Sequence, residues 1–350
     1  LSIATFTMSM SGTFLVRSGI LNSVHTFAND PERGIFILIF LFILIFISLI
    51  IFFVFHKENN QQIVKTHWLS KEVSILFNNW FMMYFLSVVL IGTVYPIFLE
   101  VLSSEKISVG TPFYIQLIIP FLIPFLIFMS IGPNLSWIKS EFKNIRIQTI
   151  FLFIISLVIS FLILRKTDSV SLINTVLISF AFYLFFITVK DFFVKKFKNY
   201  SQKISHFGFS LLILSILLNS VFSSEIITNL KVGEKFSFKE ESITFEKIKN
   251  TESKNYKSII AYFKIENKQK NSIQLKPELR IYNQPIMVTS EADIRTTLYS
   301  DKFLVINLVK GNEFFNVRYQ IKPFMIWIWI STLLLVIGGI FSLFKKSHEK

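Results

Sequence analysis

The sequence contains no cysteine, so the chain itself can form no disulfide and offers no thiol for catalysis or metal binding. Any redox work would have to depend on a cofactor or on the thiols of a partner. Charged residues are also scarce, at 17% of the chain, whereas hydrophobic residues make up 52% and phenylalanine alone occurs 42 times. A chain of 350 residues with this composition is not a set of ordinary soluble domains.

Long apolar runs dominate the sequence and reach the ~20 residues that are needed to cross about 30 Å of hydrocarbon. They predict a polytopic α-helical membrane protein of about eight spans, the first truncated, with a small antiparallel β domain outside the membrane. Pro120 and Pro124 fall inside one run and should kink its helix. The expected helices lie near 1–16, 34–55, 73–98, 113–132, 147–164, 170–189, 206–222 and 323–344.

The first residue, Leu1, lies inside an apolar stretch that has no positively charged segment and no cleavage site. A secretory signal peptide is therefore not expected. Because the first helix begins abruptly, we expect a fragment whose upstream spans are missing, in preference to the product of a split gene.

The basic residues of the short loops predict the orientation of the helices, since cytoplasmic loops are enriched in Lys and Arg. Placing the loop around His25 on the outer side puts the larger basic set inside. The inner loops and tail then hold Lys57, Lys65, Lys71, Lys139, Lys143, Arg146, Lys190, Lys195, Lys196, Lys198, Lys203, Lys345, Lys346 and Lys350, and the outer loops hold Arg17, Arg33, Lys106, Arg165 and Lys166. An aromatic belt would then place Trp68 and Trp137 at the inner interface, and Trp327 and Trp329 at the outer one.

A hydrophilic segment at 223–322 shows a different pattern and predicts strands, because it contains alternating or β-branched and aromatic runs: EKFSFKE, ITFEKIK, SIIAYFKIEN, SIQLKPELRIY at 272–282, KFLVINLV and FFNVRYQIK. We therefore expect a transmembrane helical bundle with the outward-facing His25 loop at 1–222, a periplasmic β-rich domain at 223–322, and a final transmembrane helix with a short basic cytoplasmic tail at 323–350. The net charge of +14 does not indicate a nucleic-acid partner, because basic residues are scattered among acidic ones without a clustered patch.

Three of the five histidines have no functional context. His56 and His67 lie beside lysines on an inner loop, and His348 lies in the terminal tail. The sequence also has no zinc-binding motif. We interpret these three histidines as ordinary polar residues near the membrane surface.

His206 differs because it lies in the apolar run KISHFGFSLLILSILL, within the first turn of the helix expected at 206–222. An ionisable side chain at membrane depth is costly and indicates function. A histidine near the interface that bonds to a neighbouring helix is an equally good interpretation from position alone. If His206 binds metal, haem is the more natural partner than zinc, because no second soft ligand is near and an apolar bundle can enclose a porphyrin.

His25 lies on the polar segment GTFLVRSGILNSVHTFANDPERG, between Arg17 and Arg33. One interpretation is an axial imidazole for haem iron, with guanidinium groups that pair with the propionates. The alternative is an amphipathic connector whose arginines lie at headgroup level. The residues alone favour the connector, because connector residues greatly outnumber ligands.

Several blocks of the sequence closely resemble the CcmF family, the haem lyase subunit of cytochrome c maturation. The blocks occur in the family's order: SGTFLVRSGILNSVHTFANDPERGIF, GTVYPIF at 92–98, ISVGTPFY at 107–114, IGP at 131–133, HFGFSLL at 206–212, NYKS at 255–258, LKPELRIYNQPIMVTSEADIRTTLYSD at 275–301 and KPFMIWIW at 322–329. The resemblance implies that His25 is the second of two outward histidines that hold the haem awaiting attachment. It implies that His206 is one of two membrane histidines that bind a resident b-type haem. The upstream half of the family pattern, with its tryptophan-rich WWD segment and the other histidines, is not in this sequence.

The resemblance also implies an activity. Haem would be positioned for covalent thioether attachment to the CxxCH thiols of an apocytochrome c on the outer side of the membrane. The expected partners are a CcmE-type haem chaperone, a CcmH-type thiol-presenting subunit, the lipid bilayer and quinol as electron donor, and Arg17 and Arg33 are candidates for propionate contacts. The expected location is the bacterial inner membrane, or the mitochondrial inner membrane for an organellar protein. A haem transporter and a non-catalytic scaffold of the maturation complex are the alternatives.

Overall fold

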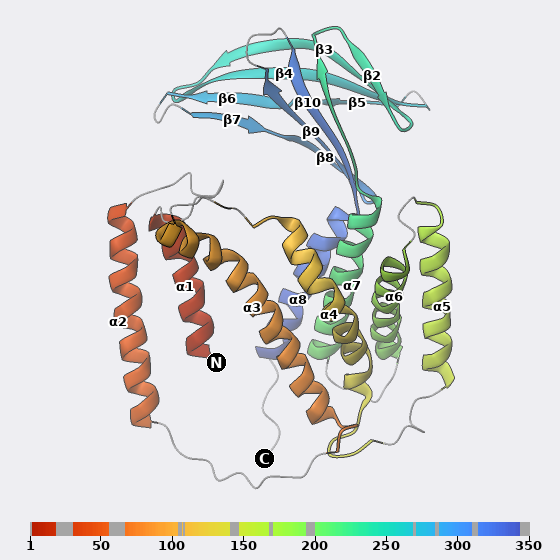
Figure 1. Cartoon of the computed structure of the whole chain (residues 1–350). Helices are drawn as coiled ribbons and strands as arrows, with labels where there is room; N and C mark the ends of the chain where they lie inside the picture. The colour runs from red at the N-terminus through yellow and green to blue at the C-terminus, as the bar shows by residue number, and fades with distance from the viewer. Residues whose placement is uncertain are drawn as a thin grey trace. The chain divides into compact units, whose positions relative to one another are not determined.

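A computed structural model describes residues 2–18, 31–55, 67–103, 107, 109–140, 147–167, 171–193, 200–268, 271–283, 287–309 and 314–343. Within these residues the chain forms the helices α1 (Ser2–Ser18), α2 (Pro31–Phe55), α3 (Lys71–Ser103), α4 (Thr111–Ile131), α5 (Ile147–Leu164), α6 (Leu172–Phe193), α7 (Tyr200–Phe222) and α8 (Met325–Leu343), with a β domain between α7 and α8 (Figure 1). Every helix expected from the apolar runs is present.

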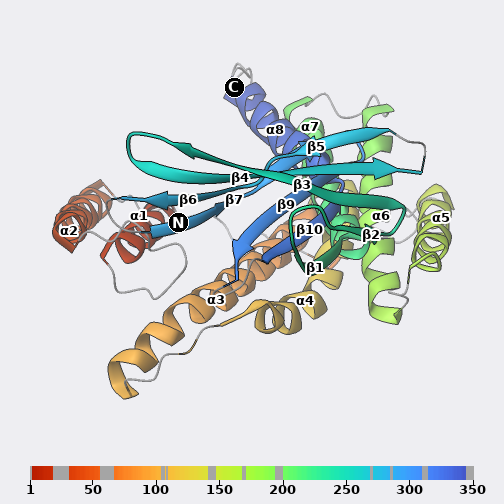
Figure 2. The same ribbon diagram turned by 90° about the horizontal axis from the view of Figure 1, so that it is seen from above.

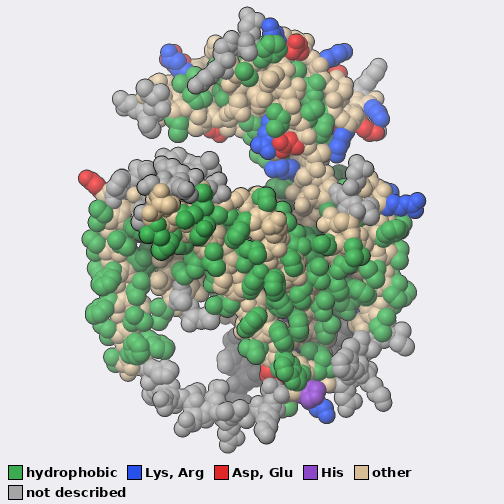
Figure 3. All heavy atoms as spheres, in the orientation of Figure 1, with side chains coloured by type: hydrophobic (Ala, Val, Ile, Leu, Met, Phe, Trp, Pro, Cys, Tyr) green, Lys and Arg blue, Asp and Glu red, His purple; other side chains and the backbone are tan. Residues whose placement is uncertain are grey.

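Six of the helices in the described residues, α2, α3, α4, α6, α7 and α8, are long and apolar enough to cross a membrane. The other two are shorter: α1 has 17 residues, and the apolar part of α5 is Thr149–Leu164. Hydrophobic side chains cover the helices in the face that Figure 3 shows, whereas charged side chains gather over the strands. The chain is a multi-pass membrane protein, as its composition predicts.

The described residues form two compact units, of which the first contains α1, α2, α3 and nearly all of α4. Aromatic rings join α3 to α4. The ring centroids of Phe77 and Phe128 lie 4.6 Å apart, and those of Phe81 and Phe125 lie 6.0 Å apart. Contacts at these separations add to the ordinary burial of apolar surface.

The segments that precede α3 and follow α4 lie side by side. The backbone N–H of His67 donates to the carbonyl of Ile138 at 2.9 Å, and the N–H of Ser140 donates to the carbonyl of Leu69 at 2.7 Å. The Glu72 carboxylate accepts the N–H of Ile138 at 3.0 Å. Both segments therefore lie at one end of the α3–α4 pair, as the predicted topology requires.

The second unit contains α5 to α8 and all of the strands. Small residues bring α7 and α8 close together. A Cβ atom on Gly208 would lie 3.1 Å from the carbonyl oxygen of Ser331, and one on Gly338 would lie 2.9 Å from the backbone nitrogen of Ser205. The Ser201 hydroxyl donates to the carbonyl of Gly338 at 2.7 Å. Small side chains of this kind allow close backbone approach between membrane helices.

The β domain consists of two antiparallel sheets with the strands β1 (Ser224–Leu230), β2 (Lys235–Phe238), β3 (Glu241–Glu252), β4 (Tyr256–Asn267), β5 (Ser272–Leu275), β6 (Glu278–Tyr282), β7 (Met287–Glu291), β8 (Asp293–Thr296), β9 (Ser300–Leu308) and β10 (Phe315–Pro323). One sheet has the order β1-β10-β9-β8. The other has the order β2-β3-β4-β6-β7, and β5 also pairs with β4. Figure 2, which shows the molecule from above, shows that β9 and β10 cross β3 and β4 at an angle.

The core of the domain lies between the two sheets. Alternate residues of β3, β4, β9 and β10 enter it, among them Phe245 and Phe263, whose rings stack at 4.4 Å. One polar group also connects the sheets. Glu241 of β3 accepts a hydrogen bond from the Tyr319 hydroxyl at 2.6 Å and forms an ion pair with Lys302. Burial, and then the hydrogen bond to Glu241, raises the pKa of the Tyr319 phenol well above its usual range.

The expected antiparallel β domain is confirmed, but three of its strands are absent from the sequence-based prediction. β1, β7 and β8 are short or partly exposed, and their apolar alternation is weak. The run at 272–282 was expected as one strand and instead splits into β5 and β6 at Pro277, which has no N–H for a ladder. The α3 helix also continues past its expected end, to Ser103, with Pro96 inside it.

Candidate functional site

His206 is the seventh residue of α7, about 9 Å along the helix axis from Tyr200. The expectation that it lies in the first turn is therefore wrong. The helix begins six residues before its expected start at 206, because contacts with neighbouring helices satisfy its polar first residues. The Lys203 ammonium donates to the carbonyl of Phe192, in the last turn of α6, at 3.4 Å. A hydropathy profile of the sequence cannot predict such a contact between helices.

Polar side chains form a stripe along α7 on both sides of His206. Lys203 and Ser210 are three and four residues from it, so the three side chains share one face of the helix. Lys203 and Ser210 are buried and His206 is half-buried. The Ser210 hydroxyl lies 2.7 Å from the Thr188 hydroxyl of α6. His206 is conspicuous in the sequence because it is ionisable, whereas Lys203 and Ser210 are not recognisable there as its neighbours, although their spacing is helical.

The donor set around His206 suits one axial position of a haem. Within the described residues no group of three histidine or acidic side chains could hold a metal ion, so a zinc site has no support there. The porphyrin supplies four nitrogen ligands to haem iron, so the protein has to supply axial ligands alone, and His206 would provide one of them. Phe209 and Ile213 follow His206 at helical spacing and give its face apolar neighbours. Haem ligation by His206 stays a prediction.

Arg17 and Arg33 lie at the same end of the α1–α2 pair. Arg17 is in the last turn of α1, and Arg33 is in the first turn of α2. The residues that follow them are in close contact, because a Cβ atom on Gly34 would lie 2.9 Å from the Cα of Ser18. His25 itself lies outside the described residues. The structure thus brings the two arginines to the two ends of the segment that carries His25.

The other histidines keep their ordinary interpretation where the structure describes them. The exposed His67 side chain accepts the backbone N–H of Leu69 through Nδ1 at 3.2 Å, which closes a turn before α3. His56 and His348 lie outside the described residues. An open apolar pocket of about 430 Å³ lies close to this turn, lined by Trp68, Val73, Leu76, Phe77 and Trp80. It includes neither of the arginines nor His206.

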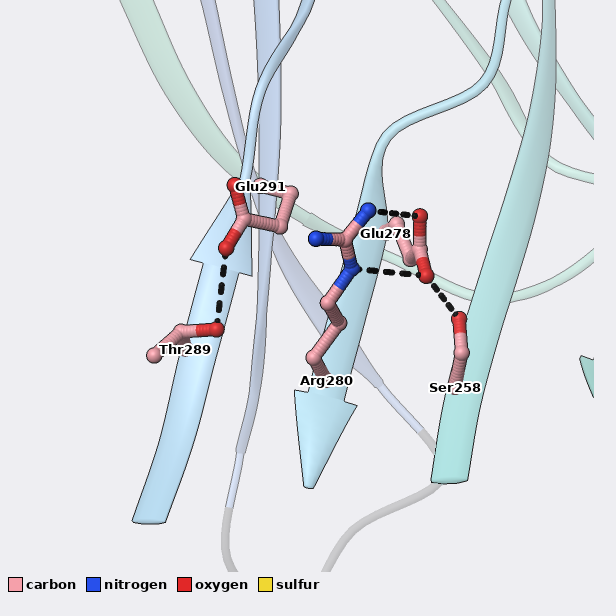
Figure 4. Close-up of polar contacts among 5 residues, drawn as sticks. All are labelled: Ser258, Glu278, Arg280, Thr289 and Glu291. Atoms are coloured by element: carbon pink, nitrogen blue, oxygen red, sulfur yellow. Dashed lines mark hydrogen bonds and ion pairs between the residues drawn. The ribbon is translucent and has the colours of Figure 1, made fainter. Parts of the chain in front are cut away.

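A polar network on the β domain was not foreseen from the sequence. Glu278 of β6 accepts two hydrogen bonds from Arg280, at 3.0 and 3.1 Å, and a third from the Ser258 hydroxyl at 2.5 Å (Figure 4). The bonds from Arg280, helped by the one from Ser258, hold the pKa of Glu278 below its usual value. The guanidinium also lies 4.9 Å from the ring centroid of Tyr256. These residues fall in the blocks NYKS and LKPELRIY, which could have directed attention to them.

Comparisons with known proteins agree on one family. The model of the family described as "CcmF C-terminal beta-sandwich" matches residues 221–323, which include all of the strands. The "Cytochrome c-type biogenesis protein CcmF" of Escherichia coli (strain K12) is 30% identical over 358 residues, covering 100% of this chain and 55% of that protein. The protein of the same name from Pseudomonas fluorescens is 30% identical over 364 residues, covering 100% of this chain and 54% of that protein.

A solved structure shares the fold. "Cytochrome c Heme Lyase CcmF" superposes with a TM-score of 0.68 at 18% sequence identity, covering 98% of this chain and 54% of the other. The chain thus spans about half the length of the relatives that it matches. The match of its β domain and the alignment of its whole length show that this chain is similar throughout to the C-terminal portion of proteins named CcmF, and the solved structure shows that it shares their fold.

Proposed function

We propose that this chain is the haem-binding C-terminal portion of a cytochrome c haem lyase. It positions haem on the outer side of the membrane for covalent attachment to an apocytochrome c. The observation that carries the proposal is the alignment of the whole chain with proteins named for cytochrome c-type biogenesis. The imidazole of His206 within the membrane helix α7 supports it, because imidazole is a common axial ligand of haem iron.

The proposed reaction needs no nucleophilic side chain from this protein. Each of the two CxxCH thiols adds to a vinyl group of the haem, which is the substrate. A carbon–sulfur bond forms, and the thiol hydrogen passes to the other vinyl carbon, so the addition itself is redox-neutral. The chain has no cysteine, so both thiols come from the apocytochrome. The protein lowers the barrier by holding the two reactants together, which removes much of the entropic cost of their encounter.

The substrate haem is assigned to the outer end of the α1–α2 pair. His25 supplies one axial imidazole, and Arg17 and Arg33 bind the propionates. The position of the two arginines, in the last turn of α1 and the first turn of α2, supports this role. A guanidinium pairs with a carboxylate through two parallel hydrogen bonds, which would fix the orientation of the porphyrin as well as its position.

His206 is assigned to a second, resident b-type haem inside the membrane. When bound, such a haem supplies an electron carrier that keeps the substrate iron reduced, with quinol as the donor. Helix α7 would supply the histidine ligand and the polar residues beside it. Lys203 and Ser210 lie on the same face as His206 and are fixed by contacts to α6, so they define the position of the imidazole along the helix.

The β domain is assigned to partner contacts. Residues 223–322 would lie in the periplasm, between the helical bundle at 1–222 and the final span and cytoplasmic tail at 323–350. A CcmE-type chaperone would deliver haem on this side, and a CcmH-type subunit would present the apocytochrome. The protein would lie in a bacterial inner membrane, or in the mitochondrial inner membrane of an organelle.

Replacing His25 with Ala in the native host tests this function. We expect a loss of holocytochrome c of at least tenfold and less haem in the purified protein, whereas His67→Ala, at an exposed turn residue, should change neither. Normal haem content and normal holocytochrome c in His25→Ala would contradict the lyase assignment and favour a scaffold. Haem uptake by proteoliposomes that contain only this protein would instead favour a transporter.

A further inference from the structure

The hairpin that joins β8 to β9 has an apolar tip. The backbone N–H of Thr297 donates to the carbonyl of Ser300 at 3.1 Å and closes a loop of two residues, Leu298 and Tyr299. Their side chains are 60% and 81% exposed. Gly, Asn, Asp and Ser dominate such turns for conformational reasons. Two large apolar or aromatic residues therefore conflict with local turn chemistry, and conflicts of this kind mark functional positions.

The tip is attached to the start of α8 by two hydrogen bonds. The indole N–H of Trp327 donates to the carbonyl oxygen of Leu298 at 3.0 Å. The backbone N–H of Phe324 donates to the carbonyl oxygen of Tyr299, also at 3.0 Å. The tip therefore lies at the level of the first turn of α8, which follows directly from β10 (Figure 1).

The length of α8 sets the depth of that first turn. The helix Met325–Leu343 has 19 residues, which span about 28 Å at 1.5 Å per residue. The hydrocarbon core of a bilayer is about 30 Å thick. The described helix is therefore no longer than the core, and its first turn has to lie at the hydrocarbon boundary. Trp327 and Trp329 in this turn are the residue type that occupies that boundary.

We propose that Leu298 and Tyr299 insert into the outer leaflet and form a second, monotopic contact between the β domain and the membrane. The partner is the lipid bilayer itself. Leu298 would enter the acyl region, and the amphipathic ring of Tyr299 would lie among the headgroups. Arg295 is exposed three residues before the tip on β8, about 10 Å along an extended strand, where its guanidinium reaches the lipid phosphates.

The contact would restrict how the β domain moves. The two connections through α7 and α8 lie next to each other, since β1 and β10 are paired neighbours. Two adjacent tethers act as one hinge, and the hydrogen bonds between the tip and the start of α8 restrain tilting about it only in part. In the sheet β1-β10-β9-β8, the inserted tip belongs to the edge strand β8, two strands away from β10. A membrane contact at this edge would therefore resist tilting of the domain.

The absence of cysteine from the sequence makes a direct test possible. A spin label at Tyr299→Cys, in the full chain in nanodiscs of phosphatidylcholine and phosphatidylglycerol, reports collisions with oxygen, which concentrates in lipid, and with a water-soluble nickel chelate. Val232→Cys is the matched control. Val232 is an exposed turn residue, 47% accessible, about 20 Å along β1 from the α7 end of that strand.

We expect the label at position 299 to collide mainly with oxygen and the label at position 232 to collide mainly with nickel. The ratio of the two collision rates should differ at least fivefold between the sites. Equal ratios at the two positions would overturn the proposal, because the tip would then be in water. Low collision rates with both reagents at position 299 would also overturn it, since protein and not lipid would then cover the tip.

Discussion

The hydroxyl groups of Thr188 and Ser210 lie 2.7 Å apart in a buried contact between α6 and α7. Ser210 is one helical turn from His206, on the same face of α7. The ring of Phe207 adds to this contact by packing against Phe185 at 5.7 Å. The α6–α7 interface therefore controls where the imidazole of His206 is held.

Thr188→Val should weaken this interface without changing its volume. A hydrogen bond between membrane helices contributes about 0.6 kcal/mol on average, so the thermal midpoint of the purified protein should fall by a few degrees at most. Thr175→Val is the control, because the Thr175 hydroxyl donates to the carbonyl of Ser171, the residue before α6, at 2.8 Å and so makes a local bond and not one between helices. A larger loss for the control than for Thr188→Val would contradict the role assigned to the interface.

Gly338→Ala should separate α7 from α8. The added methyl group would meet the backbone of Ser205 at 2.9 Å, and overpacking of this kind costs roughly 1–3 kcal/mol. The neighbouring Gly339 offers a matched control, since a Cβ atom there has nothing within 4 Å. Gly339→Ala should be neutral or slightly stabilising, as alanine is the better helix former. Equal thermal midpoints for the two variants would show that the helices are not in close contact at Gly338.

The Glu278 carboxylate should make the stability of the β domain depend on pH. Its pKa is held below the ordinary value of 4.5 by hydrogen bonds, first from Arg280. A lowered pKa contributes stability above pH 4.5 that is lost as the pH falls through the lower value of the folded state. Glu278→Gln should lower the free energy of unfolding by roughly 1 kcal/mol at pH 7. Below the folded-state pKa, where Glu278 is protonated, the substitution should have little effect. Urea unfolding followed by proteolysis measures the difference, and a constant difference from pH 7 to pH 3 would contradict the assignment.

Asp301 should have the opposite effect. Its carboxyl is buried, and its Oδ1 atom has no hydrogen-bond partner among the described residues. Burial raises the pKa of this carboxyl above its ordinary value of 3.8, so ionisation costs stability as the pH rises through the folded-state pKa. Asp301→Asn should stabilise the domain at pH 7 by roughly 1 kcal/mol, with the gain vanishing below pH 3.8. A variant that is less stable at pH 7 would show that the hydrogen bond with Thr296 outweighs the cost of burying the ionised carboxylate.

The membrane helices could be predicted closely because hydropathy alone decides where most of them lie. The helix expected at 147–164 has those bounds in the structure, since Arg165 and Lys166 end its apolar run. The start of α7 could not be predicted in the same way. Its first residues are polar, and they become helical through contacts with α6 and α8 that involve Lys203 and Ser201.

The candidate site was only partly accessible to sequence reasoning. His206 stood out because an ionisable residue inside an apolar run is conspicuous. Ser210 did not, since serine is unremarkable in a membrane helix until its partner Thr188 is seen across the interface. In the β domain, the pairing of Glu278 with Arg280 and Ser258 depends on the register between β4 and β6, which the hydrophobic pattern of a single strand does not specify.

The decisive measurement for haem binding by α7 is the absorption spectrum of His206→Ala, purified from the membranes of the native host. We expect loss or a marked decrease of the b-type haem bands, because the variant lacks the imidazole that α7 would supply as a ligand. His67→Ala should retain the bands in full, since His67 only closes a turn before α3. An unchanged b-type spectrum in the folded His206→Ala protein would contradict the claim that this chain binds a resident haem through α7.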